Sequence, residues 1–190
     1  GLRLYDPKND YKQVHEIKLN EEKGLCQLDN GLIVTSSSSN IQLYSIDKDT
    51  LTCVFEIKAA HDGGLTKIIS LPDNKFASSG YGGEVRVWEG TEPYTDIPLC
   101  SLALDNGQKG HSLIYMKEKN VIVFGLSYTL TVWNYETYEM EKEIAHVQCG
   151  DGNTIIQVDS DRVMCGDVWI FTVINITSGN VEIKIQNDKV

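Results

Sequence analysis

The sequence predicts an all-β fold built from repeated antiparallel units. Two observations predict it: apolar and polar residues alternate in short runs along the chain, and one such run recurs at a regular interval. The recurring segments are LRLYD (2–6), IQLYS (41–45), VRVWE (85–89), LTVWN (130–134) and FTVIN (171–175). No stretch has the periodicity of an amphipathic helix, so we expect strands throughout.

The interval between these segments indicates the architecture. Their fourth residues are Tyr5, Tyr44, Trp88, Trp133 and Ile174, separated by 39, 44, 45 and 41 residues. A period in the low forties, filled with short strands, is typical of the four-stranded antiparallel blade of a β-propeller. We therefore expect about four and a half blades. They are a half blade at 1–18 and full blades at 19–60, 61–105, 106–146 and 147–190.

The second full unit, 61–105, shows the expected blade most clearly. LTKIISL (65–71) is its inner strand, FASSG (76–80) the second, EVRVWE (84–89) the third and LCSLAL (99–104) the outer one. The turns PDNK (72–75) and YGG (81–83) separate the first three strands, because Pro, Asp, Asn and Gly favour turn conformations.

The order of strands predicts that the chain is part of a larger propeller. It opens with a third strand and ends with an outer strand, VEIKIQ (181–186). A propeller closes by pairing strands from its two ends, which removes exposed edges. We therefore expect further blades, or a partner chain, to cover the open edges. A closed ring of five units is expected only if a partner supplies two strands.

One unit resembles a known family. HDGGLTKI (61–68), followed by FASSG and YGGEVRVWE (81–89), is similar to the WD repeat. The resemblance implies a structural hydrogen-bonded tetrad formed by His61, Ser78, Trp88 and an Asp, and the Asp position falls on Gly82. The other units depart further from this pattern, because Tyr or Ile replaces the Trp, or the His is missing.

Two other histidines need separate placement. Ala145-His146 parallels Ala60-His61, so we expect His146 at the same blade corner if the next loop is two residues longer. Gly110-His111 imitates the Gly-His pair of the family, but the alignment predicts that His111 lies inside an inner strand. Both are expected to be structural rather than ligand-binding.

The composition limits the classes of molecule that the protein is expected to bind. The net charge of −10 opposes binding to nucleic acid, and the sequence has neither an apolar run long enough to span a membrane nor a secretory leader pattern. Five cysteines without a C-x-x-C pair predict no disulfide framework and no zinc site, and they favour a reducing, cytoplasmic location. Acidic residues gather in the last unit without the spacing of a calcium loop, so we expect a solvated edge and no cofactor; they are Asp151, Asp159, Asp161 and Asp167.

Function is expected to lie in protein binding. The sequence carries no nucleophile elbow, zinc-protease motif, P-loop or dinucleotide fingerprint, so we expect no enzyme. Tyr81, Tyr128 and Trp169 fall in the turn between the second and third strands of successive units, and Tyr and Trp often anchor interfaces. The alternative for each is packing against its own neighbouring loop.

The resemblance to WD-repeat proteins implies a rigid, non-catalytic scaffold that holds other proteins. Two alternatives stay open: a structural subunit of a large assembly, and an enzyme with its site near a central channel. An enzyme site near the channel would need His, Asp or Glu residues at the starts of the inner strands, and only His111 and Asp151 come near such positions.

Overall fold

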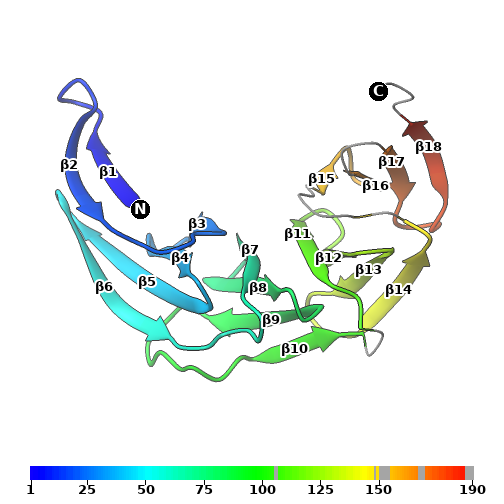
Figure 1. Cartoon of the computed structure of the whole chain (residues 1–190), viewed down its shortest axis with the longest axis horizontal. Coiled ribbons are helices and arrows are strands. Elements are labelled where there is room, and N and C mark those ends of the chain that lie inside the picture. The colour runs from blue at the N-terminus through cyan, green and yellow to red at the C-terminus, as the bar shows by residue number, and fades with distance from the viewer. Residues whose placement is uncertain (105–106, 148, 150–154, 167–169, 187–190) are drawn as a thin grey trace.

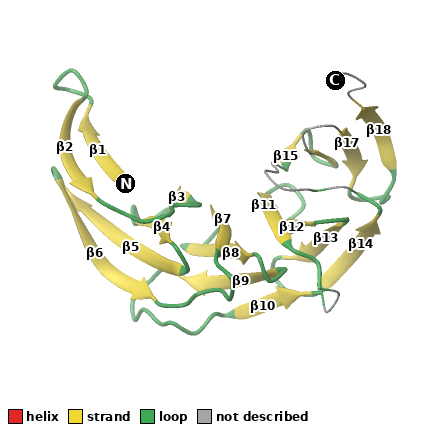
Figure 2. Ribbon diagram, viewed as in Figure 1, coloured by secondary structure: helices red, strands yellow, loops and turns green. Residues whose placement is uncertain are grey.

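The fold is all-β. The computed structural model describes residues 1–104, 107–147, 149, 155–166 and 170–186, and no helix occurs in these ranges. Figure 2 shows strands joined by turns and loops throughout. All strand pairs are antiparallel between neighbours in sequence, so each sheet is a simple meander.

A two-stranded sheet comes first, and full four-stranded sheets follow it. The two-stranded sheet is β1 (Leu2–Asp6) and β2 (Lys12–Ile17). The first full sheet is β3 (Leu25–Gln27), β4 (Ile33–Ser37), β5 (Asn40–Asp47) and β6 (Thr50–Ile57). The second is β7 (Leu65–Ser70), β8 (Lys75–Gly80), β9 (Glu84–Glu89) and β10 (Cys100–Ala103).

The remaining strands form the third and fourth full sheets. The third is β11 (Gly110–Met116), β12 (Val121–Leu126), β13 (Thr129–Asn134) and β14 (Met140–Ala145). The fourth is β15 (Ile156–Gln157), β16 (Arg162–Gly166), β17 (Ile170–Asn175) and β18 (Val181–Gln186). The alternating sequence pattern therefore identified the meanders, and it placed the strands of the second full sheet to within about one residue at each end.

The sheets follow one another along an open arc (Figure 1). The first strand of each full sheet lies on the concave side and the last strand on the convex side. β7 contacts both β3 and β11, and β11 contacts β15, so neighbouring sheets meet through their inner strands. The two-stranded sheet stands at one end of the arc and the fourth full sheet at the other, and they do not meet.

A local irregularity repeats with the sequence period. Where the third strand pairs with the fourth, the register shifts immediately before Tyr5, Tyr44, Trp133 and Ile174. Such a shift is what a β-bulge produces, and bulges increase the local twist of a strand. The period seen in the sequence is therefore a structural repeat as well.

The core lies between sheets rather than within them. Val34, Leu43 and other residues of the first full sheet pack against Phe76 and Trp88 of the second. Equivalent layers join the second sheet to the third and the third to the fourth. Burying a side chain of this size contributes about 1.5–3 kcal/mol, so each sheet depends on its neighbour for most of its stability.

Gly83 marks a close approach between two sheets. It lies in the β8–β9 turn with a φ of 81°, and a Cβ at this position would lie 2.2 Å from the carbonyl oxygen of Gln108, which precedes β11. Only glycine therefore fits. Gly31, in the β3–β4 turn, has a φ of 88° but no atom within 4 Å of the corresponding Cβ position.

This pair gives a controlled test of the contact. Gly83→Ala and Gly31→Ala both place a side chain at positive φ, which costs about 1–2 kcal/mol. Gly83→Ala must also displace the Gln108 backbone, so we expect it to lose about 2 kcal/mol more in free energy of unfolding. Urea unfolding followed by tryptophan fluorescence measures both losses. Equal losses in the two variants would contradict the close approach.

Candidate functional site

A buried chain of hydrogen bonds crosses the second full sheet. The indole Nε1–H of Trp88 donates to Ser78 Oγ at 2.7 Å, and Ser78 Oγ lies 2.7 Å from His61 Nε2. The three side chains come from β9, β8 and the segment before β7, and all three residues are buried. The structure thus brings together His61, Ser78 and Trp88, the residues that the resemblance groups in one network.

The acidic member of this network is Glu84, not a residue at position 82. Glu84 Oε1 lies 3.0 Å from His61 Nδ1, whereas Gly82 has no side chain to offer. Glu84 is the first residue of β9, two residues before Arg86, so both side chains lie on the same face of the strand. Sequence reasoning missed it because it sought an acid in the turn. The signal available was an acidic residue at the start of the strand, on the face that carries Arg86.

Arg86 links the network to the segment between β6 and β7. Its Nη2 donates to Glu84 Oε2 at 3.1 Å, and its Nη1 donates to the carbonyl oxygen of Ala60 at 2.7 Å. Arg86 Nε is buried without a hydrogen-bond partner. The guanidinium therefore ties β9 to the chain that enters the sheet.

Burial controls the charge of His61. Desolvation lowers the pKa of His61, and the nearby Glu84 carboxylate opposes this only in part. The neutral ring satisfies both neighbours if Nδ1–H donates to Glu84 and Nε2 accepts the Ser78 hydroxyl proton. His61 is therefore a neutral, structural group near pH 7.

The order Ser78–His61–Glu84 is also that of a hydrolase triad, which is recognised by geometry. Two features oppose that chemistry. Ser78 has no exposed surface, and its oxygen already accepts the indole proton of Trp88. A substrate carbonyl has no path to the hydroxyl in this structure, so the arrangement joins strands rather than attacks a ligand.

The other full sheets lack this network. The strand registers show which residues correspond to Trp88: they are Tyr44, Trp133 and Ile174. Tyr44 donates its hydroxyl to Gln42, and the Trp133 indole donates to Thr131 at 2.9 Å, so each bonds within its own strand. Ile174 makes no such bond because it is apolar. Only the second full sheet has a buried His, Ser and Trp in one chain among the described residues.

Two of the three candidate contact residues are exposed at the same end of the sheets. Tyr81 lies in the β8–β9 turn with 41% of its surface exposed, and Tyr128 lies in the β12–β13 turn with 65% exposed. In a meander, the turns between second and third strands lie at one end of every sheet. Tyr81 also lies near Gly63 and Gly64 of the preceding connection. Trp169 lies outside the described residues.

The remaining histidines differ in position. His146 is exposed, with a φ of 63°, and it precedes the buried Val147, as Ala59 with a φ of 49° precedes the buried Ala60. His146 therefore corresponds to Ala59 and not to His61, and the expected equivalence was wrong by two residues. His111 lies inside β11, as the alignment predicted, and its Nε2 is 3.2 Å from Ser127 Oγ.

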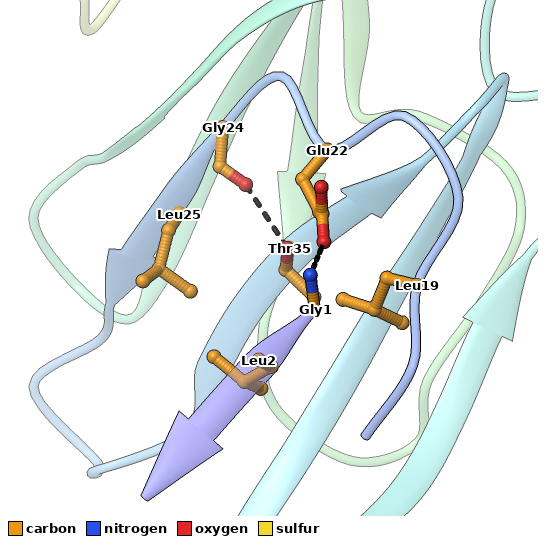
Figure 3. A pocket seen from close by; sticks show the side chains of 7 residues that line it. All are labelled: Gly1, Leu2, Leu19, Glu22, Gly24, Leu25 and Thr35. Atoms are coloured by element: carbon orange, nitrogen blue, oxygen red, sulfur yellow. Dashed lines mark hydrogen bonds and ion pairs between the residues drawn. The ribbon is translucent and has the colours of Figure 1, made fainter. Parts of the chain in front are cut away.

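One pocket lies beside the two-stranded sheet (Figure 3). Its volume is about 360 Å³, and Leu2, Leu19 and Leu25 form its apolar walls. Among its polar groups, the Thr35 hydroxyl donates to the carbonyl oxygen of Gly24 at 3.1 Å (Figure 3). The pocket offers an apolar surface between β1 and the inner strands β3 and β4.

Among the described residues, one apolar face of the fourth full sheet has no sheet packed against it. Leu130 and Ile144 of the third sheet are 0% and 6% exposed, because the fourth sheet covers them. The corresponding residues of the fourth sheet, Phe171 and Ile185, are 45% and 57% exposed. We call this surface the end face; its residues are Ile156, Met164, Phe171, Val173, Ile183 and Ile185. Ile156, Phe171, Ile183 and Ile185 are exposed. A contiguous exposed apolar surface is typical of an interaction site.

Comparison with known proteins gives no assignment. No protein-family model matches the chain, and no curated protein matches it. Within the described ranges, no group of three or more His, Cys, Asp or Glu residues is arranged to hold a metal ion, and no helix is long and apolar enough to cross a membrane.

The buried histidine predicts a pH dependence. The folded pKa of His61 is lowered, so the unfolded chain binds a proton more readily and stability falls as the pH drops below about 6.5. We expect the free energy of unfolding to decrease less between pH 7 and pH 5 in His61→Gln than in the unsubstituted protein. Urea titrations at each pH measure this difference. The control is His15→Gln, on the two-stranded sheet, which should keep the full dependence; an unchanged dependence in His61→Gln would refute the assignment.

Proposed function

We propose that the chain is part of a β-propeller of the WD-repeat kind and acts as a non-catalytic scaffold for other proteins. The observation that carries this proposal is the succession of meander sheets, each packed face to face on the next along an arc, with inner strands adjacent. The network of His61, Ser78 and Trp88 supports the same family. The network holds strands together, so the binding surface lies elsewhere.

Additional strands that closed the arc into a ring would cover two exposed parts of it. β1 has an unpaired edge, because the two-stranded sheet lacks the inner strands that every full sheet has. The apolar pocket beside β1 lies next to β3 and β4, where such inner strands would pack. A further sheet would cover the end face in the same way. We propose that further blades or a partner chain supply these surfaces.

Partner proteins are the class that fits the exposed surface. The net charge of −10 disfavours nucleic acid, whose backbone carries the same sign of charge. Tyr81 and Tyr128 give two exposed aromatic groups at one end of adjacent sheets, and such residues are enriched among the side chains that dominate interface energies. The free thiols, of which Cys149 and Cys165 are buried, fit a cytoplasmic location.

The aromatic residues can be tested with a control on the opposite end. We expect Tyr81→Ala combined with Tyr128→Ala to lose specific partners in a quantitative pull-down, since truncating an anchor residue costs about 2 kcal/mol or more of binding free energy. Tyr11→Ala removes an aromatic that is 71% exposed in the β1–β2 turn, a turn between third and fourth strands, and should keep the partners. Retention of every partner by the folded double variant argues against the aromatic surface.

A second candidate function is a structural subunit of a large assembly, and the end face favours it. Assembly subunits bury apolar surface against neighbours. In this case the end face, rather than the turns with Tyr81 and Tyr128, would carry the main contact.

The end face predicts self-association of the isolated chain. We expect sedimentation velocity to show concentration-dependent association, and Ile183→Lys with Ile185→Lys to abolish it, because charges on an apolar face oppose its burial. Val54→Lys changes an exposed apolar residue on β6, outside the end face, and should leave association unchanged. Monomeric behaviour of the unsubstituted chain at all concentrations would count against this surface as a contact.

A further inference from the structure

A second pocket lies between the third and fourth full sheets. It has a volume of about 510 Å³ and is lined by Tyr128 from the β12–β13 turn, His146 after β14, Ile170 and Thr172 from β17, and Val181 and Lys184 from β18. Tyr128 is the aromatic residue that the sequence places among the candidate contacts. The pocket therefore adjoins the proposed binding end of the sheets.

Two positions that line the pocket carry different residues from their counterparts in the second full sheet. The strand registers show that Ile170 and Thr172 correspond to Glu84 and Arg86 of the second full sheet. There, the carboxylate and guanidinium bond to each other and to the neighbouring connection, and so occupy the space between sheets. Ile and Thr are shorter and carry no charge. The corresponding space between the third and fourth sheets stays open.

Three side-chain groups that line this pocket are unpaired among the described residues. Within the part of the chain that the structure describes, the Lys184 ammonium, the His146 ring and the Tyr128 hydroxyl make no hydrogen bond or ion pair. Lys142, which lines another pocket between the same two sheets, instead donates to the carbonyl oxygen of Thr177. The second pocket thus keeps its donors free.

The described lining of the pocket differs in charge from the protein as a whole. The chain has 27 acidic and 17 basic residues, yet none of the described residues that line this pocket is acidic. Lys184 offers three N–H donors, Tyr128 and Thr172 each offer a hydroxyl, and the His146 ring offers at least one N–H. Such a set of donors around a cation is suited to an oxyanion, because hydrogen bonds to charged oxygens are about twice as strong as neutral ones.

We propose that this pocket binds an oxyanion, carboxylate or phosphate, carried on a peptide segment of a partner protein. The apolar side chains of Ile170 and Val181 would contact the aliphatic part of that residue. The identity of the carrier rests on the proposed scaffold function, whereas the oxyanion site itself does not.

NMR titration of the 190-residue chain tests the site directly. The probes are N-acetyl-O-phosphoserine N-methylamide, N-acetylglutamate N-methylamide and the neutral N-acetylglutamine N-methylamide, in about 0.15 M salt, where long-range repulsion from the acidic surface is screened beyond about 8 Å. We expect saturable shifts of the amide signals around Tyr128 and Lys184 with at least one anionic probe and none with the neutral one.

Matched variants separate the pocket from overall charge. Lys184→Met and Lys67→Met each remove one positive charge, but Lys67 lies on β7, away from the pocket. Lys184→Met should weaken anion binding about tenfold or more, and Lys67→Met should leave it unchanged. His146→Gln, at an exposed position, should weaken it as well and guards against misfolding of a single variant.

The outcomes are distinct. Binding of both anionic probes supports an oxyanion site that accepts a carboxylate, and binding of the phosphoserine probe alone supports one that requires phosphorylation. Absence of saturable shifts with both anionic probes, or equal affinity in Lys184→Met and the unsubstituted protein, overturns the proposal. If the anions bind but the double tyrosine variant keeps all its partners, the site stands and the scaffold function of that end fails.

Discussion

The structure depends on apolar packing between successive sheets. Each full sheet presents apolar residues on both faces, and a sheet of four short strands cannot cover either face by itself. Phe76 and Trp88 fill one such layer, and Phe124 and Trp133 contribute to the next. The second and third full sheets are each packed on two neighbours, whereas among the described residues the fourth is packed on one. This dependence on neighbours explains why the fold extends as an arc and why its free face is apolar.

The polar residues between sheets differ from repeat to repeat, whereas the apolar packing between sheets is similar. The second full sheet fills its inter-sheet space with His61, Glu84 and Arg86, and the fourth leaves the corresponding space open. One position can thus carry a structural hydrogen bond in one repeat and line an open pocket in another, because the backbone is already held by the apolar layers. A repeat without the network therefore keeps the same backbone arrangement and carries other polar residues at these positions.

The sequence predicted the strands and their period, because alternation and spacing are local properties, and the resemblance to the WD repeat implied the association of His61, Ser78 and Trp88. It did not predict Glu84 as the acidic partner, since that depends on how far a side chain reaches from a strand. The sequence also did not predict the pocket at Lys184, because its lining comes from two different sheets. His146 was misplaced because the length of a connection cannot be derived from a dipeptide match.

The register shift that recurs between third and fourth strands has a consequence for the convex rim. Each outer strand exposes a row of backbone donors and acceptors, which would invite strands of other molecules to pair with it. A shift before Tyr44, Trp133 and Ile174 adds local twist to the outer hairpin of three full sheets. A strongly twisted edge is a poor template for a straight incoming strand. The twist of these three outer hairpins therefore disfavours pairing with strands of other molecules.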